Sequence, residues 1–336
     1  MVVYLFAGRC TRREKVRQRR NIELEDAALS EKTKTRYYLA LRKLLPYFES
    51  AECLDDLDNK ICTWIRVMWK AGEPLLTVGD GLSAIQHFEP STKKRLPHAW
   101  KLFTVWRKVE IPSRAPPLTR VLVRSMAVFE MENNRLDMTV MLLLGFFCLL
   151  RTGELLQLTV NDFCLGHSSG LVSLKHTKSG RRDNASEFVS FTDVPTLEAV
   201  KQLISLRKET NTGPRLWVHS PSAFRQQFKL LCDHYDLSSH QFRPYSLRRR
   251  GATHHFQITN SMEAALIKGR WQSSKVARIY ISDGLSYLPN LKMSTRTTTL
   301  IKRFHFFSPH LGWARRMNAW KRGDLLEIFL FCLKNS

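Results

Sequence analysis

Apolar residues recur every three or four positions along the first third of the chain, the spacing that gives an α-helix one buried face. Ser30 is a favourable N-cap for a first helix, predicted over residues 31–49. The predicted core stripe of this helix has four members: Leu41, Leu44, Leu45 and Phe48. Pro46 should kink the last turn or end the helix early, because proline cannot donate a backbone hydrogen bond.

The same spacing recurs three more times before residue 110. It predicts a helix around residues 61–68, a shorter one over residues 78–88 and a third around residues 99–106. Gly72 marks the end of the first of these, and the third must stop before Pro112. Four helices of this size predict a small all-helical domain.

Three prolines lie within six residues at positions 112–117, where they hold the chain extended and exclude a helix. This segment is therefore predicted to link two domains. The predicted parts of the chain are a basic N-terminal arm (1–29), a helical domain (30–111), the linker (112–117), a second domain (118–290) and a basic tail with an apolar terminal helix (291–336).

The second domain alternates helical and extended patterns. Two short β-branched and aromatic runs, at residues 171–174 and 187–191, predict a hairpin whose turn covers residues 178–184. Helical periodicity predicts the remaining elements, over residues 121–131, 137–158, 195–208, 221–235, 246–256 and 261–268, followed by a helical segment that bears Tyr280. The fold class is therefore mainly α with a small β-sheet.

The net charge of the chain indicates what kind of partner it binds. The formal net charge of +23 and an isoelectric point near 10.0 imply a polyanion. Nucleic acid is the partner that we expect, and a membrane surface or an acidic protein is the alternative. Basic residues with few acidic neighbours lie on the outer faces of the first predicted domain and suit phosphate contacts: Lys32, Lys34, Arg36, Arg42, Lys43, Lys93, Lys94, Arg95, Lys101, Arg107 and Lys108.

The basic run at residues 12–20 has no apolar period, so it is either a solvated tail, a DNA-contacting arm or a nuclear targeting signal. Seven scattered cysteines without a CxxC pair favour a reducing compartment. The longest apolar run, residues 140–150, is about half of a bilayer span. The N-terminus is apolar before it is charged, the reverse of a secretory signal. We expect an intracellular, DNA-associated protein, located in the nucleus if the cell is eukaryotic.

Several side chains of the second domain could carry chemistry. Arg151 closes an apolar run, where an arginine is costly to bury unless it is paired, and Glu154 lies three residues later on the same helical face. The pair is either a structural ion pair, or Glu154 binds the outer nitrogens of the guanidinium and leaves its inner edge available to a phosphate. Lys178 lies in the predicted turn, where a lysine is usually solvated unless the hairpin folds over a site.

Arg248 begins a run of three arginines at the start of a predicted helix. One of the three can point into a site while Arg249 and Arg250 meet a DNA backbone. Tyr280 is either a half-buried core residue or a nucleophile. As a nucleophile it needs nearby cations, because a phenol has a pKa of about 10.

Taken in order, these residues resemble the tyrosine recombinase (phage integrase) family. Arg151 lies in the motif LLRTGEL, Lys178 follows a strand, and Arg248 ends the motif YSLR. Tyr280 follows Trp271 by nine residues. The resemblance covers residues 118–282 by motif. Residues 30–111 are more weakly similar to the helical, SAM-like core-binding domain that precedes the family's α+β catalytic domain.

The resemblance implies a C-shaped clamp around double-stranded DNA, a homotetramer on that DNA, and no metal or nucleotide cofactor. It also implies that Tyr280 cleaves a DNA strand and forms a 3′-phosphotyrosine link. Arg151 and Arg248 would neutralise the non-bridging oxygens, and Lys178 would protonate the leaving 5′-oxygen.

In the same resemblance, Trp271 would contact the phosphate and Glu154 would orient Arg151. The family usually continues with a short helix that packs on a neighbouring protomer. The apolar end of the tail, residues 325–333, is either such a helix, an intramolecular core helix or a segment without a role.

Tyr245 stands where the family pattern has a histidine. A tyrosine donates a hydrogen bond but is a poor base at pH 7, so its presence should slow proton transfer. Three functions therefore stay open. They are a site-specific recombinase or integrase of a mobile element, a recombinase-like DNA-binding protein that no longer cuts, and a type IB topoisomerase-like enzyme.

Overall fold

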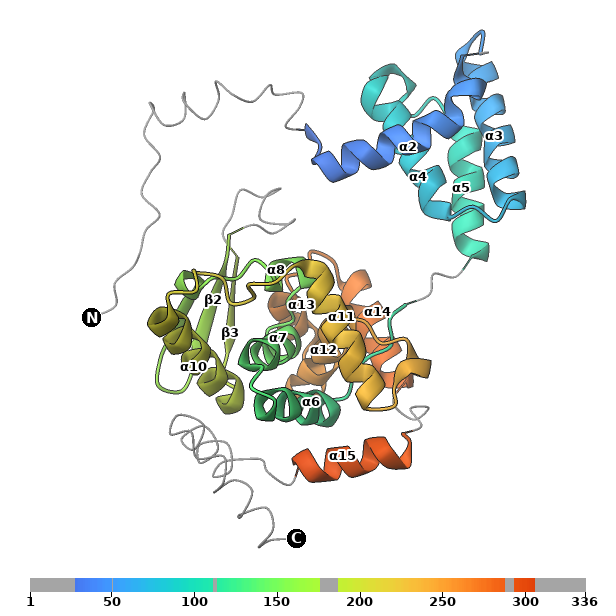
Figure 1. Ribbon diagram of the computed structural model, residues 1–336. Coiled ribbons are helices and arrows are strands. Elements are labelled where there is room, and N and C mark those ends of the chain that lie inside the picture. Colours follow the sequence, from blue (N-terminus) through green and yellow to red (C-terminus); the bar gives the residue numbers. More distant parts are fainter. Residues whose placement is uncertain (1–27, 50, 111–113, 176–186, 288–292, 306–336) are drawn as a thin grey trace, which may run out of the picture. The chain divides into compact units, whose positions relative to one another are not determined.

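The computed structural model describes residues 28–49, 51–110, 114–175, 187–287 and 293–305. The chain divides into two compact units, Met1–Ser113 and Arg114–Ser336. The described residues are mainly helical and contain one small three-stranded sheet, so the predicted fold class is confirmed (Figure 1).

The described part of the first unit is helical. Its elements are α2 (Glu31–Phe48), α3 (Leu54–Lys70), α4 (Leu75–Phe88), a 3-10 turn (Pro90–Thr92) and α5 (Pro97–Val109). The sequence sets their starts, because the Ser30 hydroxyl accepts a hydrogen bond from the backbone N–H of Thr33 at the beginning of α2. Pro97 occupies the first turn of α5, where no intrahelical donor is needed.

One hydrophobic core joins these helices around the fully buried Trp64. The predicted apolar face of α3 is buried as expected, but the predicted stripe of α2 is partly wrong. Leu45 and Phe48 are 48% and 38% exposed, because the face that α2 turns to the core runs through Ala40 and Leu44. The helix also continues past Pro46, so the proline does not end it early.

The second unit contains the sheet and the remaining helices. Its helices are α6 (Arg120–Glu132), α7 (Leu136–Phe147), α8 (Thr152–Leu155), α10 (Val194–Thr210), α11 (Pro221–His234), α12 (Tyr245–Thr259), α13 (Met262–Gly269), α14 (Ser274–Tyr287) and α15 (Thr295–His305). Its strands are β1 (Phe163–Leu165), β2 (Gly170–Leu174) and β3 (Glu187–Phe191). Two 3-10 turns, Val160–Asp162 and Ser238–His240, complete the described elements.

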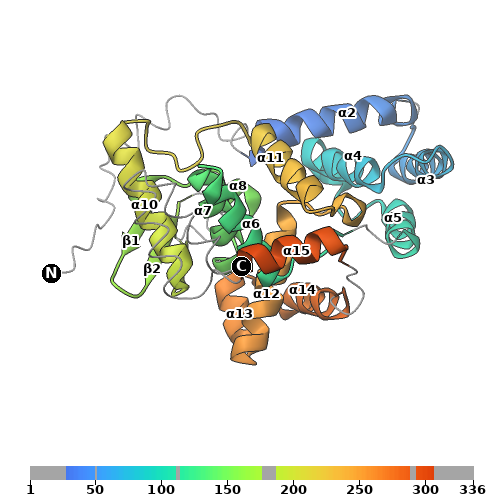
Figure 2. The same ribbon diagram turned by 60° about the horizontal axis from the view of Figure 1, so that its bottom comes forward.

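The sheet is antiparallel with the order β1-β2-β3. Val172 of β2 pairs with Phe163 on one side and Val189 on the other, and alternate residues of β2 are buried. Figures 1 and 2 show α10 lying along the sheet, and both contribute to one core. The hairpin strands were predicted, whereas the three-residue β1 was not.

The predicted single helix over residues 137–158 is wrong. α7 ends at Phe147, and the chain turns before α8 starts at Thr152. Leu149 has φ of 50°, in the left-handed region, which ends helical geometry. The break turns the carbonyl oxygen of Leu149 towards the guanidinium of Arg248, which donates a hydrogen bond to it.

Helix α12 crosses α7 at unusually close range. A Cβ atom on Gly251 would lie 2.1 Å from the carbonyl oxygen of Phe146, so only glycine fits at this crossing. The crossing carries Arg248, one turn earlier on α12, to the break after α7.

Helix α15, which the sequence pattern did not predict, packs on α6. The hydroxyl of Ser125 donates to the carbonyl of Leu300 at 3.3 Å, and Thr297 donates to the carbonyl of Tyr235. The predicted apolar helix at residues 325–333 lies outside the described residues, as does most of the basic arm. Within the described ranges, none of the helices combines the length and hydropathy of a membrane span.

Candidate active site

Arg151 stands at the first turn after the break. It is the N-cap of α8, and its backbone N–H donates to Glu154 Oε2 at 2.8 Å. Its Nη1 lies 2.5 Å from Glu154 Oε1. The Arg151 side chain is 31% exposed while that of Glu154 is 5% exposed, so the pair holds the guanidinium at the surface with part of it open to a ligand.

Arg248 lies beneath it and is 1% exposed. Its guanidinium donates to the carbonyl oxygens of Leu149 and, at 2.6 Å, Gly269. The Trp271 ring covers it, with 5.0 Å between Arg248 Cζ and the ring centroid. Burial, with Arg270 and Arg151 nearby, lowers the pKa of Arg248 to about 9, so the group is still a cation at neutral pH.

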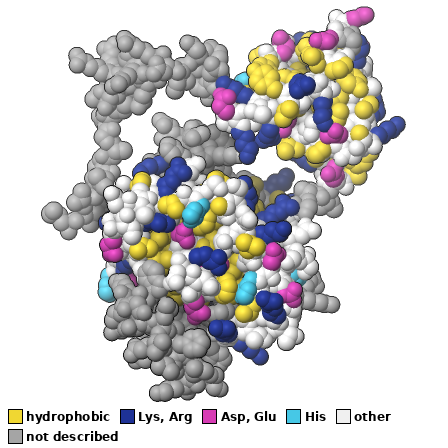
Figure 3. Space-filling model, viewed as in Figure 1, with side chains coloured by type: hydrophobic (Ala, Val, Ile, Leu, Met, Phe, Trp, Pro, Cys, Tyr) yellow, Lys and Arg dark blue, Asp and Glu magenta, His cyan; other side chains and the backbone are white. Residues whose placement is uncertain are grey.

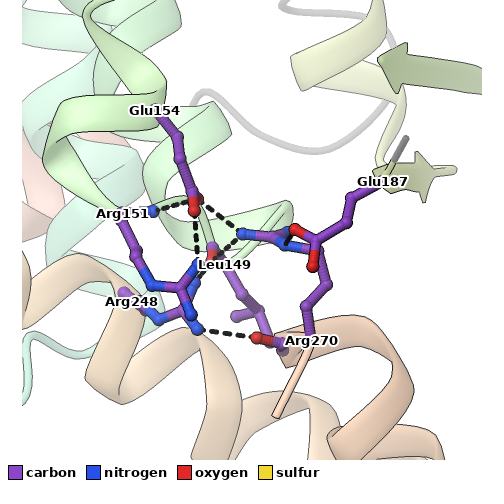
Figure 4. A network of polar contacts seen from close by, with 7 residues as sticks. Leu149, Arg151, Glu154, Glu187, Arg248 and Arg270 are labelled. Atoms are coloured by element: carbon purple, nitrogen blue, oxygen red, sulfur yellow. Dashed lines mark hydrogen bonds and ion pairs between the residues drawn. The ribbon is translucent and has the colours of Figure 1, made fainter. Parts of the chain in front are cut away.

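Arg270 is the member of the site that the sequence pattern did not reveal. Its Nη2 lies 2.6 Å from Glu154 Oε2, and its Nε lies 3.2 Å from Glu187 Oε2 (Figure 4). Its side chain is 5% exposed. The only signal was its place directly before Trp271, because neither carboxylate partner is close to it in sequence.

Three aromatic rings lie close to the arginines. The ring centroids of Trp271 and Tyr280 are 4.9 Å apart, and those of Tyr245 and Tyr280 are 5.9 Å apart. Helix α14 holds Tyr280 against α12, where Thr253 Oγ1 donates to the Tyr280 carbonyl at 3.2 Å. Arg249 Cζ lies 5.9 Å from the centroid of the Tyr280 ring.

The environment of Tyr245 sets its protonation. Burial raises the pKa of this phenol, although the neighbouring cations Arg248, Arg151 and Arg249 act in the opposite direction. Tyr245 is therefore a neutral hydrogen-bond donor at pH 7 and not a base. It is 38% exposed, so part of its side chain is accessible to a ligand.

The other basic residues predicted for the second domain have different outcomes. Arg249 and Arg250 were expected to meet a DNA backbone, but they are only 4% and 8% exposed because α12 is packed on several sides, and Arg249 donates to the Ala115 carbonyl at 2.7 Å. Lys178 lies outside the described residues. The strands of its predicted hairpin are described, and Glu187 at the start of β3 contacts Arg270.

The charges of the cluster do not cancel. The cluster contains three guanidinium groups, those of Arg151, Arg248 and Arg270, and two carboxylates, those of Glu154 and Glu187, which leaves one net positive charge. A buried surplus cation beside the partly exposed guanidinium of Arg151 suits a phosphate or another oxyanion. Among the described residues, no group of three or more His, Cys, Asp or Glu side chains could hold a metal ion.

No family model matches the chain, and no curated protein matches it. Several solved structures match the chain. The Tn1549 transposon integrase in complex with transposon right-end DNA superimposes with a TM-score of 0.55 at 15% identity, covering 85% of this chain and 95% of that one. The same integrase with a circular-intermediate DNA gives 0.51 at 17% identity, covering 83% and 98%.

The XerH site-specific recombinase bound to its difH substrate gives a TM-score of 0.50 at 15% identity, covering 76% of this chain and 78% of that one. These structures are tyrosine recombinases and integrases. The chain therefore has the tyrosine recombinase fold, in which a helical unit is followed by a mainly helical unit with a small sheet.

Proposed function

We propose that this chain is a site-specific DNA recombinase that cleaves and rejoins DNA through a 3′-phosphotyrosine link at Tyr280. One observation carries the proposal. Trp271 covers the guanidinium of the buried Arg248 and packs on the ring of Tyr280, so a surplus cation and a candidate nucleophile share one small site. The XerH recombinase structure holds its difH substrate and the Tn1549 integrase structure holds transposon right-end DNA, which supports DNA as the partner.

The residues divide the reaction between them. The Tyr280 hydroxyl attacks the scissile phosphorus and releases its proton to solvent, so that a P–O bond to the phenol oxygen forms and the P–O5′ bond breaks. Arg151 and Arg248 neutralise the non-bridging oxygens as negative charge develops there. Lys178 gives the leaving 5′-oxygen its proton, and Tyr245 donates a hydrogen bond to the phosphate. The reverse attack by a 5′-hydroxyl of another strand restores the phosphodiester.

The proposal extends to the two units. We assign the clamp on duplex DNA to the helical unit, residues 30–111, and the chemistry to residues 118–290. The exposed basic side chains of the helical unit supply phosphate contacts. The working form is a homotetramer on two DNA sites, integrating or rearranging DNA inside the cell.

A covalent trap tests the chemistry. The protein is incubated with nicked suicide duplexes built from the DNA that flanks its gene, and adducts are separated under denaturing conditions. We expect an adduct that Tyr280→Phe abolishes and that Tyr38→Phe, an exposed tyrosine of the first unit, leaves unchanged. An adduct that survives Tyr280→Phe would overturn the assignment of the nucleophile.

The second candidate is a recombinase-like DNA-binding protein that no longer cuts. Tyr245 favours it, because a neutral phenol cannot relay protons as an imidazole can. This candidate predicts tight, salt-sensitive binding to the same duplexes without any adduct. A full yield of adduct on a proven target site excludes it.

A further inference from the structure

We propose that Arg270 is a positioning residue that couples the β2–β3 hairpin to the phosphate-binding arginines. The inference rests on the function proposed above and adds a residue and a mechanism to it. Arg270 bridges Glu154, which holds Arg151, and Glu187, which begins β3 (Figure 4). One buried side chain thus connects the arginine site with the base of the hairpin.

The first half of the bridge fixes Arg151. Arg270 Nη2 donates a hydrogen bond to Oε2 of Glu154 at 2.6 Å, and Arg151 Nη1 donates one to Oε1 at 2.5 Å. A carboxylate held at both oxygens by two guanidinium groups cannot rotate freely, so its orientation and that of Arg151 are set together. The backbone N–H of Arg151 also donates to Oε2, so loss of Arg270 leaves that oxygen with this single donor and loosens the hold on the carboxylate and on Arg151.

The second half of the bridge reaches the hairpin. Glu187 pairs with Leu174 in the β2–β3 ladder, at the end of the two strands. Its side chain is 16% exposed and its Oε2 lies 3.2 Å from Arg270 Nε. A partly buried carboxylate without this cation would be costly, so the contact holds the end of β3 against the site.

The backbone around Arg270 joins the same network. Arg270 has φ of 54° at the C-terminus of α13, a conformation that glycine or asparagine usually supplies. Its neighbours both contact Arg248, since the Gly269 carbonyl accepts from the guanidinium and the Trp271 ring covers it. The strained position therefore places a cationic side chain next to the two residues that hold Arg248.

The partners of Arg270 separate positioning from direct catalysis. Two of its nitrogens face carboxylates, whereas the guanidinium of Arg248 donates to carbonyl oxygens and keeps its charge, and Arg151 is 31% exposed. Arg151 is the group that a phosphate reaches first. Arg270 acts through it, and through the hairpin.

Single-turnover cleavage of the suicide duplex and amide hydrogen exchange, measured on the full chain, test the coupling. We expect Arg270→Met to lower the cleavage rate constant at saturating DNA by about 100-fold, the cost of a misplacement near 1 Å, with DNA affinity unchanged within about twofold. Exchange in β3, Glu187–Phe191, should accelerate in the same variant. Arg270→Lys, which can keep one carboxylate, should recover part of both effects.

The control is Lys268→Met, a neighbouring half-buried cation whose electrostatic partners are Cys148 and Asp193. It should change neither the rate nor the exchange of β3. Glu187→Gln should reproduce the exchange effect, and combining it with Arg270→Met should add little further. The unfolding temperature shows how much of the Arg270→Met variant is folded. A loss of activity no larger than the loss of folded protein would mean that Arg270 forms a structural ion pair only.

Unchanged exchange in β3 of Arg270→Met overturns the coupling whether or not the protein cuts DNA. The exchange measurement needs no DNA, so it tests the coupling independently of the recombinase. A wild-type protein that forms no adduct contradicts the proposed recombinase only. An unchanged rate in Arg270→Met on a cleaved substrate overturns the role in catalysis. The two proposals can therefore fail separately.

Discussion

Individual side chains give the candidate site its charge. Arg248 is almost completely buried, and its hydrogen bonds go to two carbonyl oxygens and not to a carboxylate. Carbonyl groups orient a guanidinium without cancelling its charge, so the cation keeps its capacity to stabilise an oxyanion. Arg151 differs, because Glu154 neutralises part of its charge and leaves its direction fixed.

Replacing Tyr245 with histidine should accelerate DNA cleavage. Arg248 and Arg151 lie close to position 245, and such cations lower the pKa of an imidazole, which is then neutral and able to accept a proton at pH 7. We expect the single-turnover rate constant to rise by about 100-fold, the lower end of the range typical of one acid/base group. Tyr245→Phe should lower it. Equal rates for the tyrosine and histidine forms would show that no proton passes through this position.

Glu130 should make the stability of the second unit depend on pH. It is fully buried on α6, and burial raises its pKa to about 7 although its Oε2 lies 2.7 Å from Arg135 Nε. The folded protein then binds this proton more tightly than the unfolded chain does. The contribution of Glu130 to stability is therefore lost as the pH rises from about 4.5 to about 7.

Glu130→Gln removes this dependence. The difference in the free energy of unfolding, variant minus wild type, should increase by about 3 kcal/mol between pH 4.5 and pH 8. Urea denaturation across that range measures the difference. Glu263→Gln, at an exposed position of α13, serves as the control and should leave the curves parallel. A difference that stays constant with pH would contradict the raised pKa.

At the scale of elements, the predictability of the fold depended on whether burial was one-sided. Helix α3 buries one face, so its apolar period located it. Helix α7 is buried on every side, and a helix that is apolar all round gives no signal of where it ends. The break at Leu149 was missed for this reason, and the three-residue β1 was too short for a period.

The residues of the candidate site divide in the same way, into those that a local sequence pattern reveals and those that it does not. Arg151, Arg248, Trp271 and Tyr280 were named from their order along the chain, and the structure brings them together. Arg270 was not named, because its importance depends on Glu154 and Glu187, which precede it by more than one hundred and more than eighty residues. Contacts over such separations are set by tertiary packing and leave no local pattern in the sequence.

The crossing of α12 and α7 should be intolerant of a single methyl group. In Gly251→Ala the new Cβ would meet the Phe146 carbonyl at 2.1 Å and the Leu149 side chain at 2.5 Å, which forces the helices apart. We expect a loss of about 3 kcal/mol in the free energy of unfolding, typical of severe overpacking. Thermal and urea unfolding measure it.

Gly153→Ala is the matched control, since nothing lies within 4 Å of the Cβ position there. Alanine in that exposed helical turn should be neutral or stabilise the protein by up to about 1 kcal/mol. Equal stability of the two variants would mean that the helices can separate without cost. The prediction also links packing to chemistry, because separated helices move Arg248 away from the Leu149 carbonyl.

The whole molecule carries its excess charge on both units. Figure 3 shows Lys and Arg side chains over the visible face of each unit, with acidic side chains between them. In the helical unit some bases are paired, such as Arg36 with Asp80 and Lys43 with Glu73. The exposed trio Lys93, Lys94 and Arg95 lies at the end of the turn before α5 and is a candidate for phosphate contacts.

DNA affinity should therefore fall steeply with salt. Each neutralised phosphate releases counterions, so a protein with six to ten phosphate contacts loses about 10³–10⁵-fold in affinity between 50 and 200 mM salt. Fluorescence anisotropy with a labelled duplex measures the logarithm of the binding constant against that of the salt concentration. A nearly flat line would remove nucleic acid as the polyanion that the charge of +23 implies.

The clamp assigned to the helical unit makes a sharper prediction from the same plot. Replacing Lys93, Lys94 and Arg95 with glutamine should reduce the slope by about 0.9 for each phosphate that is no longer neutralised, so by up to about 2.7, and should weaken binding to all sequences alike. Neutralising the paired Lys43 should change the slope less, because Glu73 already holds it 2.5 Å away. An unchanged slope in the triple variant would place the DNA on another face of the helical unit. A full loss of slope would confine binding to that unit, since the arginines near Tyr280 would then contribute no phosphate contact.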